Sequence, residues 1–197
     1  YLFDIKNFYY LYKQEVKIEN NFTSSDLKTL SKFLDDNVFK IEKLLGQFLK
    51  NICLIIKTSE ITEIKIGIKK KNYQEIVSRK NFENTLIDAK DLFNENFQRE
   101  KIIHILLNKY MVNEKTYSSF KDDLVGDTFC VELKFISISK DLVTQINNIL
   151  EKYQISTSQY MDQNYIRSFF HNNFTNISDV AYKIKKGFFE KFFQLFS

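Results

Sequence analysis

The sequence contains no proline, no tryptophan, two cysteines and only four glycines among its 197 residues. The glycines stand far apart, at Gly46, Gly67, Gly126 and Gly187. Phosphate-binding loops built on clustered glycines are therefore excluded, including the dinucleotide fingerprint and the P-loop. Cys53 and Cys130 alone provide neither a disulfide framework nor a four-cysteine zinc site. We expect no cofactor and no metal ion.

Long apolar runs are also missing. No stretch approaches the ~18 apolar residues that a membrane-spanning helix needs. The first residues, from Tyr1 to Tyr12, include Asp4 and Lys6 and lack the pattern of a secretory signal. We therefore expect a cytosolic protein.

The composition is that of a globular chain, with 44% hydrophobic and 27% charged residues. Lysine and arginine total 29 against 25 acidic residues, which gives a net charge of +4. Lysine, asparagine, isoleucine, phenylalanine and tyrosine share A/T-rich codons, so a genome bias explains the mild basicity. Scattered lysines are a weak argument for nucleic acid, and we expect no nucleic-acid partner.

Apolar residues alternate in some segments and recur at helical spacing in others. Phe129–Ile138 is the clearest strand, and Asn81–Phe97 reads as a helix. Two further helices are expected to meet near Asp35 and Asp36. From Ile52 the order is strand, strand, helix, strand, strand, helix, strand. This order predicts an α+β fold with the helices on one sheet face.

No local pattern supplies catalytic chemistry. Neither His104 nor His171 has a nucleophile or carboxylate at a catalytic spacing, and a structural role is favoured for His104. Asp122, Asp123 and Asp127 lack the alternating ligands and final glutamate of an EF-hand loop. A solvated turn is favoured over a calcium site there. We expect that the protein is not an enzyme.

A local excess of positive charge begins in the predicted strand Thr62–Lys71. The basic residues are Lys65, Lys69, Lys70, Lys71, Arg79 and Lys80, opposed by Glu75. Such a run fits contact with phosphate or an acidic partner, or else a solvated face. Lys65, Lys69 and Lys70 are the candidate partner-binding residues.

The end of the chain is amphipathic and follows a polar stretch. At ~100° per residue, its large apolar side chains fall within an arc of about 160°. The candidate membrane-binding residues are Lys183, Lys185, Lys186, Phe188, Phe189, Lys191, Phe192, Phe193, Leu195 and Phe196. A wide aromatic face with flanking lysines is typical of a helix lying in a membrane interface. A terminal helix docked on the core is the alternative.

Two regions resemble the FtsA family of actin-like bacterial cell-division proteins. Residues 102–113, with His104, Tyr110 and Val112, are similar to the family's "LHV-P-x-x-Y-x-V-D" strand. The following strand, helix and strand and the preceding residues 41–71 match the order of its SHS2 insert, a strand–helix–strand–strand module. The amphipathic end resembles the family's membrane-targeting helix, which also follows a linker.

The resemblance implies four parts. They are a degenerate actin-like remnant (1–37), an SHS2-like domain (38–170), a linker (171–182) and a membrane-targeting helix (183–197). It implies a peripheral protein on the cytoplasmic face of the inner membrane, attached to an anionic surface. The SHS2-like domain would bind divisome proteins or associate with its own kind during cell division and septum formation.

The departures from the family shape the expected function. Lys6 stands where the family's first phosphate loop, "D-I-G-x-S-K", has its glycine, and the second phosphate loop is missing. We therefore expect no ATP binding or hydrolysis. The lobe that binds FtsZ is also missing, so a direct FtsZ contact is not expected. The alternatives are a PilM-like pilus-assembly adaptor and a purely structural interaction module with a docked C-terminal helix.

Overall fold

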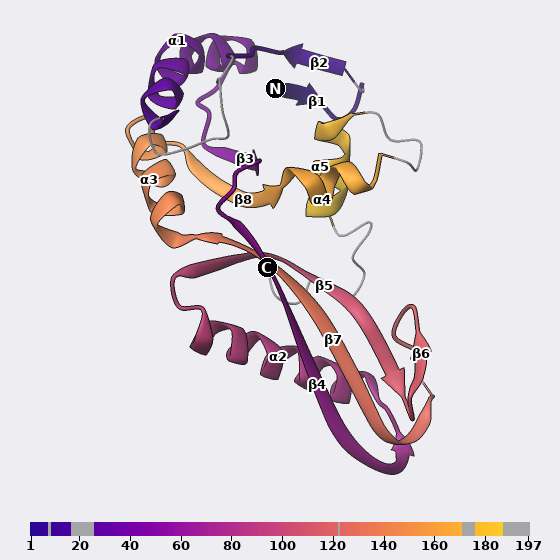
Figure 1. The fold of residues 1–197 in the computed structure, drawn as a ribbon. Helices are drawn as coiled ribbons and strands as arrows, with labels where there is room; N and C mark the ends of the chain where they lie inside the picture. Colours follow the sequence, from indigo (N-terminus) through magenta and orange to yellow (C-terminus); the bar gives the residue numbers. More distant parts are fainter. Residues whose placement is uncertain (8, 17–25, 122, 171–175, 187–197) are drawn as a thin grey trace. The chain divides into compact units, whose positions relative to one another are not determined.

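The computed structural model describes residues 1–7, 9–16, 26–121, 123–170 and 176–186. The chain divides into two compact units, and the second is inserted into the first. A discontinuous unit comprises Tyr1–Ile61 and Asp141–Ser197, and an inserted unit comprises Thr62–Lys140 (Figure 1). Helices pack on sheets in a mixture of both elements, which confirms the predicted α+β class.

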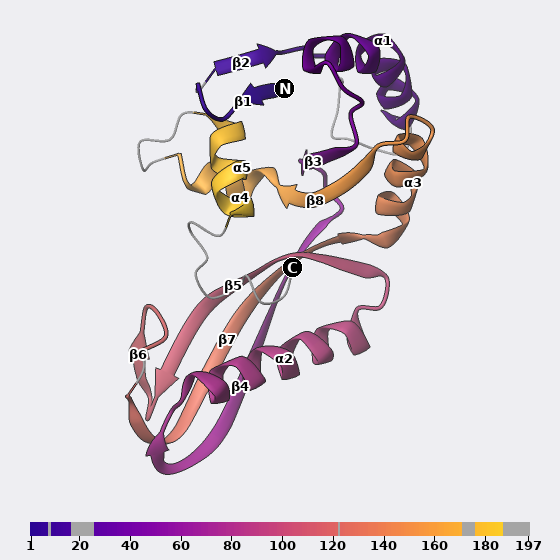
Figure 2. The same cartoon turned by 180° about the vertical axis from the view of Figure 1, so that it is seen from behind.

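The inserted unit is a sheet with one helix. Along the chain its elements are β4 (Ile61–Ile76), α2 (Arg79–Asn96), β5 (Glu100–Val112), β6 (Lys115–Tyr117) and β7 (Val125–Ser139). The spatial order of the strands is β4-β7-β5-β6, with β5 antiparallel to both β6 and β7. Figures 1 and 2, taken from opposite sides, show α2 along one face of this sheet.

The core of the inserted unit lies between α2 and the sheet. Alternate residues of β7 are buried, namely Phe129, Val131, Leu133 and Phe135. The buried stripe of α2 consists of Phe82, Thr85, Leu86, Ala89 and Phe93. The rings of Phe93 and Phe135 stack with centroids 4.9 Å apart. The sequence predicted both apolar faces, and the structure confirms them.

The polar stretch after β5 contains regular structure. Asn113 and Glu114 both have positive φ, 45° and 67°, and close a two-residue hairpin between Val112 and Lys115. β7 already begins at Val125. At Gly126 a Cβ atom would come within 2.4 Å of the Val112 side chain, so this position requires glycine.

In its described residues, the discontinuous unit combines two short sheets with four helices. Its elements are β1 (Leu2–Asp4), β2 (Tyr9–Tyr12), α1 (Leu27–Leu45), β3 (Asn51–Ile56), α3 (Lys140–Glu151), β8 (Ser156–Asp162), α4 (Gln163–Ser168) and α5 (Ile177–Lys185). β1 and β2 form an antiparallel hairpin, whereas β3 and β8 pair in parallel.

The predicted break near Asp35 and Asp36 is wrong, because α1 is one continuous helix. Both aspartates are exposed, so they stay solvated within the helix instead of capping a new one. The carboxylate of Asp35 also accepts a hydrogen bond of 2.7 Å from the Tyr153 hydroxyl. The helix ends instead at Gly46, whose φ of 66° is the left-handed conformation of a C-cap.

The predicted linker over 171–182 is wrong for residues 177–182, which belong to α5. The Asn176 side chain caps this helix by accepting a hydrogen bond of 2.8 Å from the Ser178 amide. Val180, Ala181 and Ile184 are buried in a cluster with Met161 and Ile166. The residues from Asn176 to Asp179 are therefore a helix start and not a tether. Residues 171–175 lie outside the described residues.

The predicted domain boundaries are also wrong. We expected a remnant over 1–37 and one domain over 38–170, whereas α1, β3, α3 and β8 all belong to the discontinuous unit. The reason is the parallel pairing of β3 with β8, which joins residues on either side of the inserted unit. A strand–helix–strand–strand order does occur, but within Thr62–Lys140.

Burial of His104 predicts a measurable pH dependence of stability. The side chain is 5% exposed, and burial lowers its pKa from 6.5 to about 4. The unfolded chain therefore takes up a proton on this residue near pH 6.5, whereas the folded chain resists protonation until about pH 4. The free energy of unfolding should fall across this window as the pH decreases, by roughly 3 kcal/mol.

His104→Gln removes the titrating group. Urea unfolding at pH 7.5 and at pH 4.5 should show that the wild type loses about 2–3 kcal/mol more than the variant between the two conditions. Carboxylates titrate in both proteins, so the difference isolates the histidine. An equal loss in the two proteins would show that His104 accepts a proton freely in the folded state.

Candidate interaction surface

Strand β4 has two chemically different faces, because side chains alternate along a strand. Ile64, Ile66 and Ile68 are half-buried on the face that α2 covers. Lys65, Gly67 and Lys69 are exposed on the opposite face, which we call the open face. The half-buried strand predicted over Thr62–Lys71 is confirmed and extends to Ile76.

The open face carries charges from all three long strands. Lys109 of β5 lies opposite Glu132 of β7, and Met111 lies opposite Cys130. Lys134 of β7 forms a 3.3 Å ion pair with Glu63 of β4. Within the described residues no helix of the inserted unit lies on this side of the sheet, as the two opposite views show (Figures 1 and 2). The open face is therefore a polar, lysine-bearing surface.

The surroundings of both thiols raise their pKa. Burial, followed by the charge of Glu132, raises the pKa of the Cys130 thiol, although Lys69 and Lys109 act in the opposite direction. Burial also raises the pKa of the Cys53 thiol. A reactive cysteine needs a lowered pKa in an electropositive setting. Both thiols are therefore protonated near neutral pH.

The structure separates the three predicted partner-binding lysines. Lys65 and Lys69 lie together on the open face. Lys70 lies on the other face and forms a 2.5 Å ion pair with Asp88 of α2, so its assignment to the same surface is wrong. Lys71, which we did not select, shares the alternation of Lys65 and Lys69 and is exposed. The alternation of side chains along a strand was the sequence signal that could have identified Lys71.

Strand β4 is an edge of the sheet. In the described part of the chain its one neighbour is β7. The Ser137 hydroxyl donates to the Thr62 carbonyl at 3.4 Å, and the Asn72 side-chain amide donates to the Gly126 carbonyl at 3.1 Å. The order of these two contacts along the strands shows that β4 and β7 run antiparallel. The other side of β4 presents backbone groups for pairing in the part before Tyr73 and Gln74, whose positive φ values of 50° and 62° turn the chain.

Three of the four predicted membrane-binding lysines, Lys183, Lys185 and Lys186, belong to the docked helix α5 or its end. Lys183 forms a 2.8 Å ion pair with Asp179, and Lys185 donates to the Ser158 hydroxyl at 3.0 Å. The Lys186 ammonium lies 6.0 Å from the centroid of the Tyr182 ring. The start predicted for the terminal helix, at Lys183, is therefore wrong. The other candidates, Phe188, Phe189, Lys191, Phe192, Phe193, Leu195 and Phe196, lie outside the described residues.

In the turn between β1 and β2, backbone amides that could bind an anion already donate hydrogen bonds to a carboxylate of the same turn. The Asp4 carboxylate accepts hydrogen bonds from the backbone amides of Lys6 and Asn7, at 2.8 and 3.1 Å. The Asn7 side chain donates a third, at 2.9 Å. This hydrogen bonding, led by the Asn7 side chain, lowers the pKa of Asp4. The amides that a phosphate would need in this turn are thus already paired with a carboxylate.

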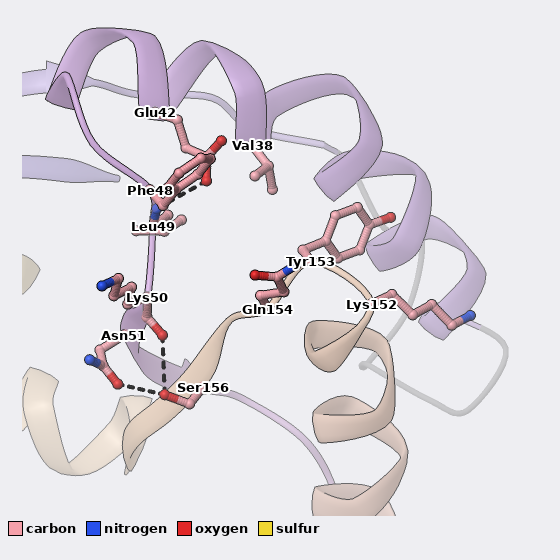
Figure 3. Close-up of a pocket in the computed structure, with 10 residues that line it drawn as sticks. All are labelled: Val38, Glu42, Phe48, Leu49, Lys50, Asn51, Lys152, Tyr153, Gln154 and Ser156. Carbon is pink, nitrogen blue, oxygen red and sulfur yellow. Dashed lines mark hydrogen bonds between the residues drawn. The ribbon is translucent and has the colours of Figure 1, made fainter.

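The discontinuous unit has a hollow of about 490 Å³ between the end of α1, the start of β3 and the end of α3. Figure 3 shows its lining, in which Lys50 and Lys152 point away from each other. The Glu42 carboxylate accepts from the Leu49 amide at 3.0 Å. The Ser156 hydroxyl lies within hydrogen-bond distance of the Lys50 carbonyl and the Asn51 side-chain oxygen. These polar groups satisfy one another and form no catalytic pair.

Two further findings concern the described residues alone. They contain no group of three histidine, cysteine or acidic side chains placed to hold a metal ion. Asp122 of the acidic stretch and His171 lie outside them. None of the described helices is both long and apolar enough to span a bilayer.

The chemistry of the β1–β2 turn predicts that ATP does not bind there. Titration calorimetry of the full chain with millimolar ATP and Mg²⁺ should give heats of dilution only. Asp4→Asn should leave this result unchanged, because position 6 still carries a lysine and not a glycine, which would let the backbone approach a phosphate. A saturating isotherm with the wild type would show that phosphate is bound despite the paired amides.

No protein-family model matches the chain, and no curated protein matches it.

Proposed function

We propose that this protein is a non-enzymatic adaptor of the FtsA-like type. It attaches peripherally to the cytoplasmic face of the inner membrane through its C-terminal residues and binds divisome proteins through the inserted unit. The observation that carries the proposal is the insertion of a strand–helix–strand–strand unit into a second unit that begins with a β-hairpin.

The order of elements supports the FtsA-like assignment. The inserted unit runs β4, α2, β5 and β7, with the short strand β6 added after β5. This is the order of the SHS2 insert to which the sequence is similar, although it occupies 62–140 and not the longer range inferred from the sequence. The His104-containing strand lies within it as β5. The turn with Lys6 lies in the β-hairpin, where the family has its first phosphate loop.

The chemistry of the described residues supports binding over catalysis. His104 is buried and neutral near pH 7, and both thiols are protonated. The open face, by contrast, carries exposed lysines, and α2 packs on the opposite face of the same sheet. A rigid, charged sheet surface suits a protein partner whose charge is complementary.

One observation favours the alternative of a structural module with a docked C-terminal helix. Residues Ile177–Lys185 are helical, and Val180 and Ile184 are 0% and 4% exposed. This docking accounts for the helix up to Lys185. Only the phenylalanine-rich residues after Lys186 then remain for the membrane role. Whether these residues bind a membrane decides between the membrane-attached adaptor and the structural module.

Co-flotation with vesicles that contain phosphatidylglycerol tests the membrane role. The wild type should float, because five phenylalanines and Leu195 provide a wide apolar surface for the interface. Phe192→Asp with Phe196→Asp should reduce the floated fraction by about tenfold or more, since each buried ring contributes roughly 1.5–3 kcal/mol when insertion is complete. High salt should lower the floated fraction of the wild type only in part.

The matched control is Phe39→Asp with Phe48→Asp. These two rings are 75% and 77% exposed in the discontinuous unit, so the chemical change is the same at a different place. The control variant should float like the wild type. If the wild type stays at the bottom of the gradient, or if only the control variant is released, the C-terminal residues do not form the attachment.

A further inference from the structure

We propose that the free edge of β4 binds an extended acidic segment of a partner protein as an added β-strand. The segment places an aromatic residue opposite Gly67 and acidic residues opposite Lys65 and Lys69. The inference rests on the proposed adaptor function, because it names the class of partner that the inserted unit receives.

The first support is the length and composition of the free edge. β4 is extended from Ile61 until Tyr73 and Gln74, which have positive φ, and its one neighbour among the described strands is β7. Ile64, Ile66 and Ile68 give its first half a high β-propensity. An edge strand of this kind presents unpaired N–H and C=O groups that an extended peptide can pair with. No proline blocks the edge, because the chain contains none.

The second support is a glycine that the chain's own structure does not require. Gly46 has a positive φ, and at Gly126 a side chain would collide with Val112, so both are explained. At Gly67 a Cβ atom would meet nothing within 4 Å, and the backbone is not left-handed. Glycine weakens a strand interior unless another backbone or ring approaches it closely. An aromatic residue on an adjacent strand covers such an edge glycine.

The third support is the charge around Gly67. Lys65 and Lys69 flank it on the open face, and neither forms an ion pair with the described residues. The nearby acid Glu63 is engaged by Lys134. Directly opposed residues on paired strands interact, and opposite charges stabilise the pair. The edge therefore favours acidic residues two positions before and after the aromatic one.

The same charges disfavour a second copy of this chain. If two β4 strands paired antiparallel about Gly67, Lys65 of one copy would lie opposite Lys69 of the other. Like charges directly opposite each other destabilise a strand pair. Lys71, on the same face, extends the positive row. The occupant that fits is an acidic strand and not another β4.

The test measures binding of a short labelled peptide to the full chain. The probe is a blocked peptide that alternates threonine with a central glutamate–tyrosine–glutamate set, so that the three side chains share one face. Fluorescence anisotropy at low salt should show saturable binding. Replacing both glutamates of the peptide by lysine should weaken binding by about tenfold, and replacing its tyrosine by alanine should also weaken it.

Charge reversal on the protein makes the result specific. The double variant Lys65→Glu with Lys69→Glu should no longer bind the acidic peptide and should bind the peptide in which lysine replaces both glutamates. Lys40→Glu with Lys43→Glu changes the net charge equally on exposed positions of α1 and should bind like the wild type. Equal thermal unfolding of the variants checks that the fold is kept. Backbone amide shifts on peptide addition should concentrate in β4.

Three outcomes would overturn the proposal. They are no preference for the acidic peptide, loss of binding in both double variants alike, and shifts confined to residues outside β4. A dimer that dissociates on Lys65→Glu with Lys69→Glu would assign the edge to a second copy instead. The peptide assay needs no membrane, so its failure leaves the flotation result standing, and failed flotation leaves the peptide result standing.

Discussion

The packing of α2 on one face of the β4-β7-β5 sheet is the interaction on which the inserted unit depends. Phe93 stacks on Phe135 with centroids 4.9 Å apart, and Phe82 meets Tyr110 edge-on at 5.9 Å. These rings are almost fully buried, so one face of the sheet forms part of the hydrophobic core. Because the unit has one helix, the other face keeps its charges, and β4 keeps a free edge. The candidate interaction surface is a consequence of this asymmetry.

The discontinuous unit explains how an insertion of this size is accommodated. The chain leaves it after β3 and returns through α3 to β8, and these two strands pair in parallel over Asn51–Ile56 and Ser156–Asp162. The hydroxyl of Ser156 and the carbonyl of Lys50 tie the start of this pair together. Helices α4 and α5 then bury Met161 and Ile166 with Val180. A unit that closes on itself through this strand pair can accommodate an inserted unit.

Local periodicity was sufficient to predict β7, α2 and most of β4, because each has an apolar face that repeats within a few residues. It also places Lys65 and Lys69 on one face, and the same alternation excludes Lys70 from it. It could not show that β3 pairs with β8, since that pairing joins residues that are distant in the sequence. It missed α5 because the polar Asn176 is a helix cap, and it divided α1 because exposed aspartates resemble caps. The exposure of Gly67 needed coordinates, since the sequence does not show what surrounds a glycine.

The central claim is that β4 presents an unpaired edge next to a positively charged sheet face. Amide hydrogen exchange of the full chain, followed by NMR for each residue, tests it most directly. Our account predicts that amides of the central strand β7 exchange slowly, whereas alternate amides along β4 exchange much faster because they face solvent. Slow exchange of all β4 amides in the free protein would show that the edge is already covered, which would contradict the account.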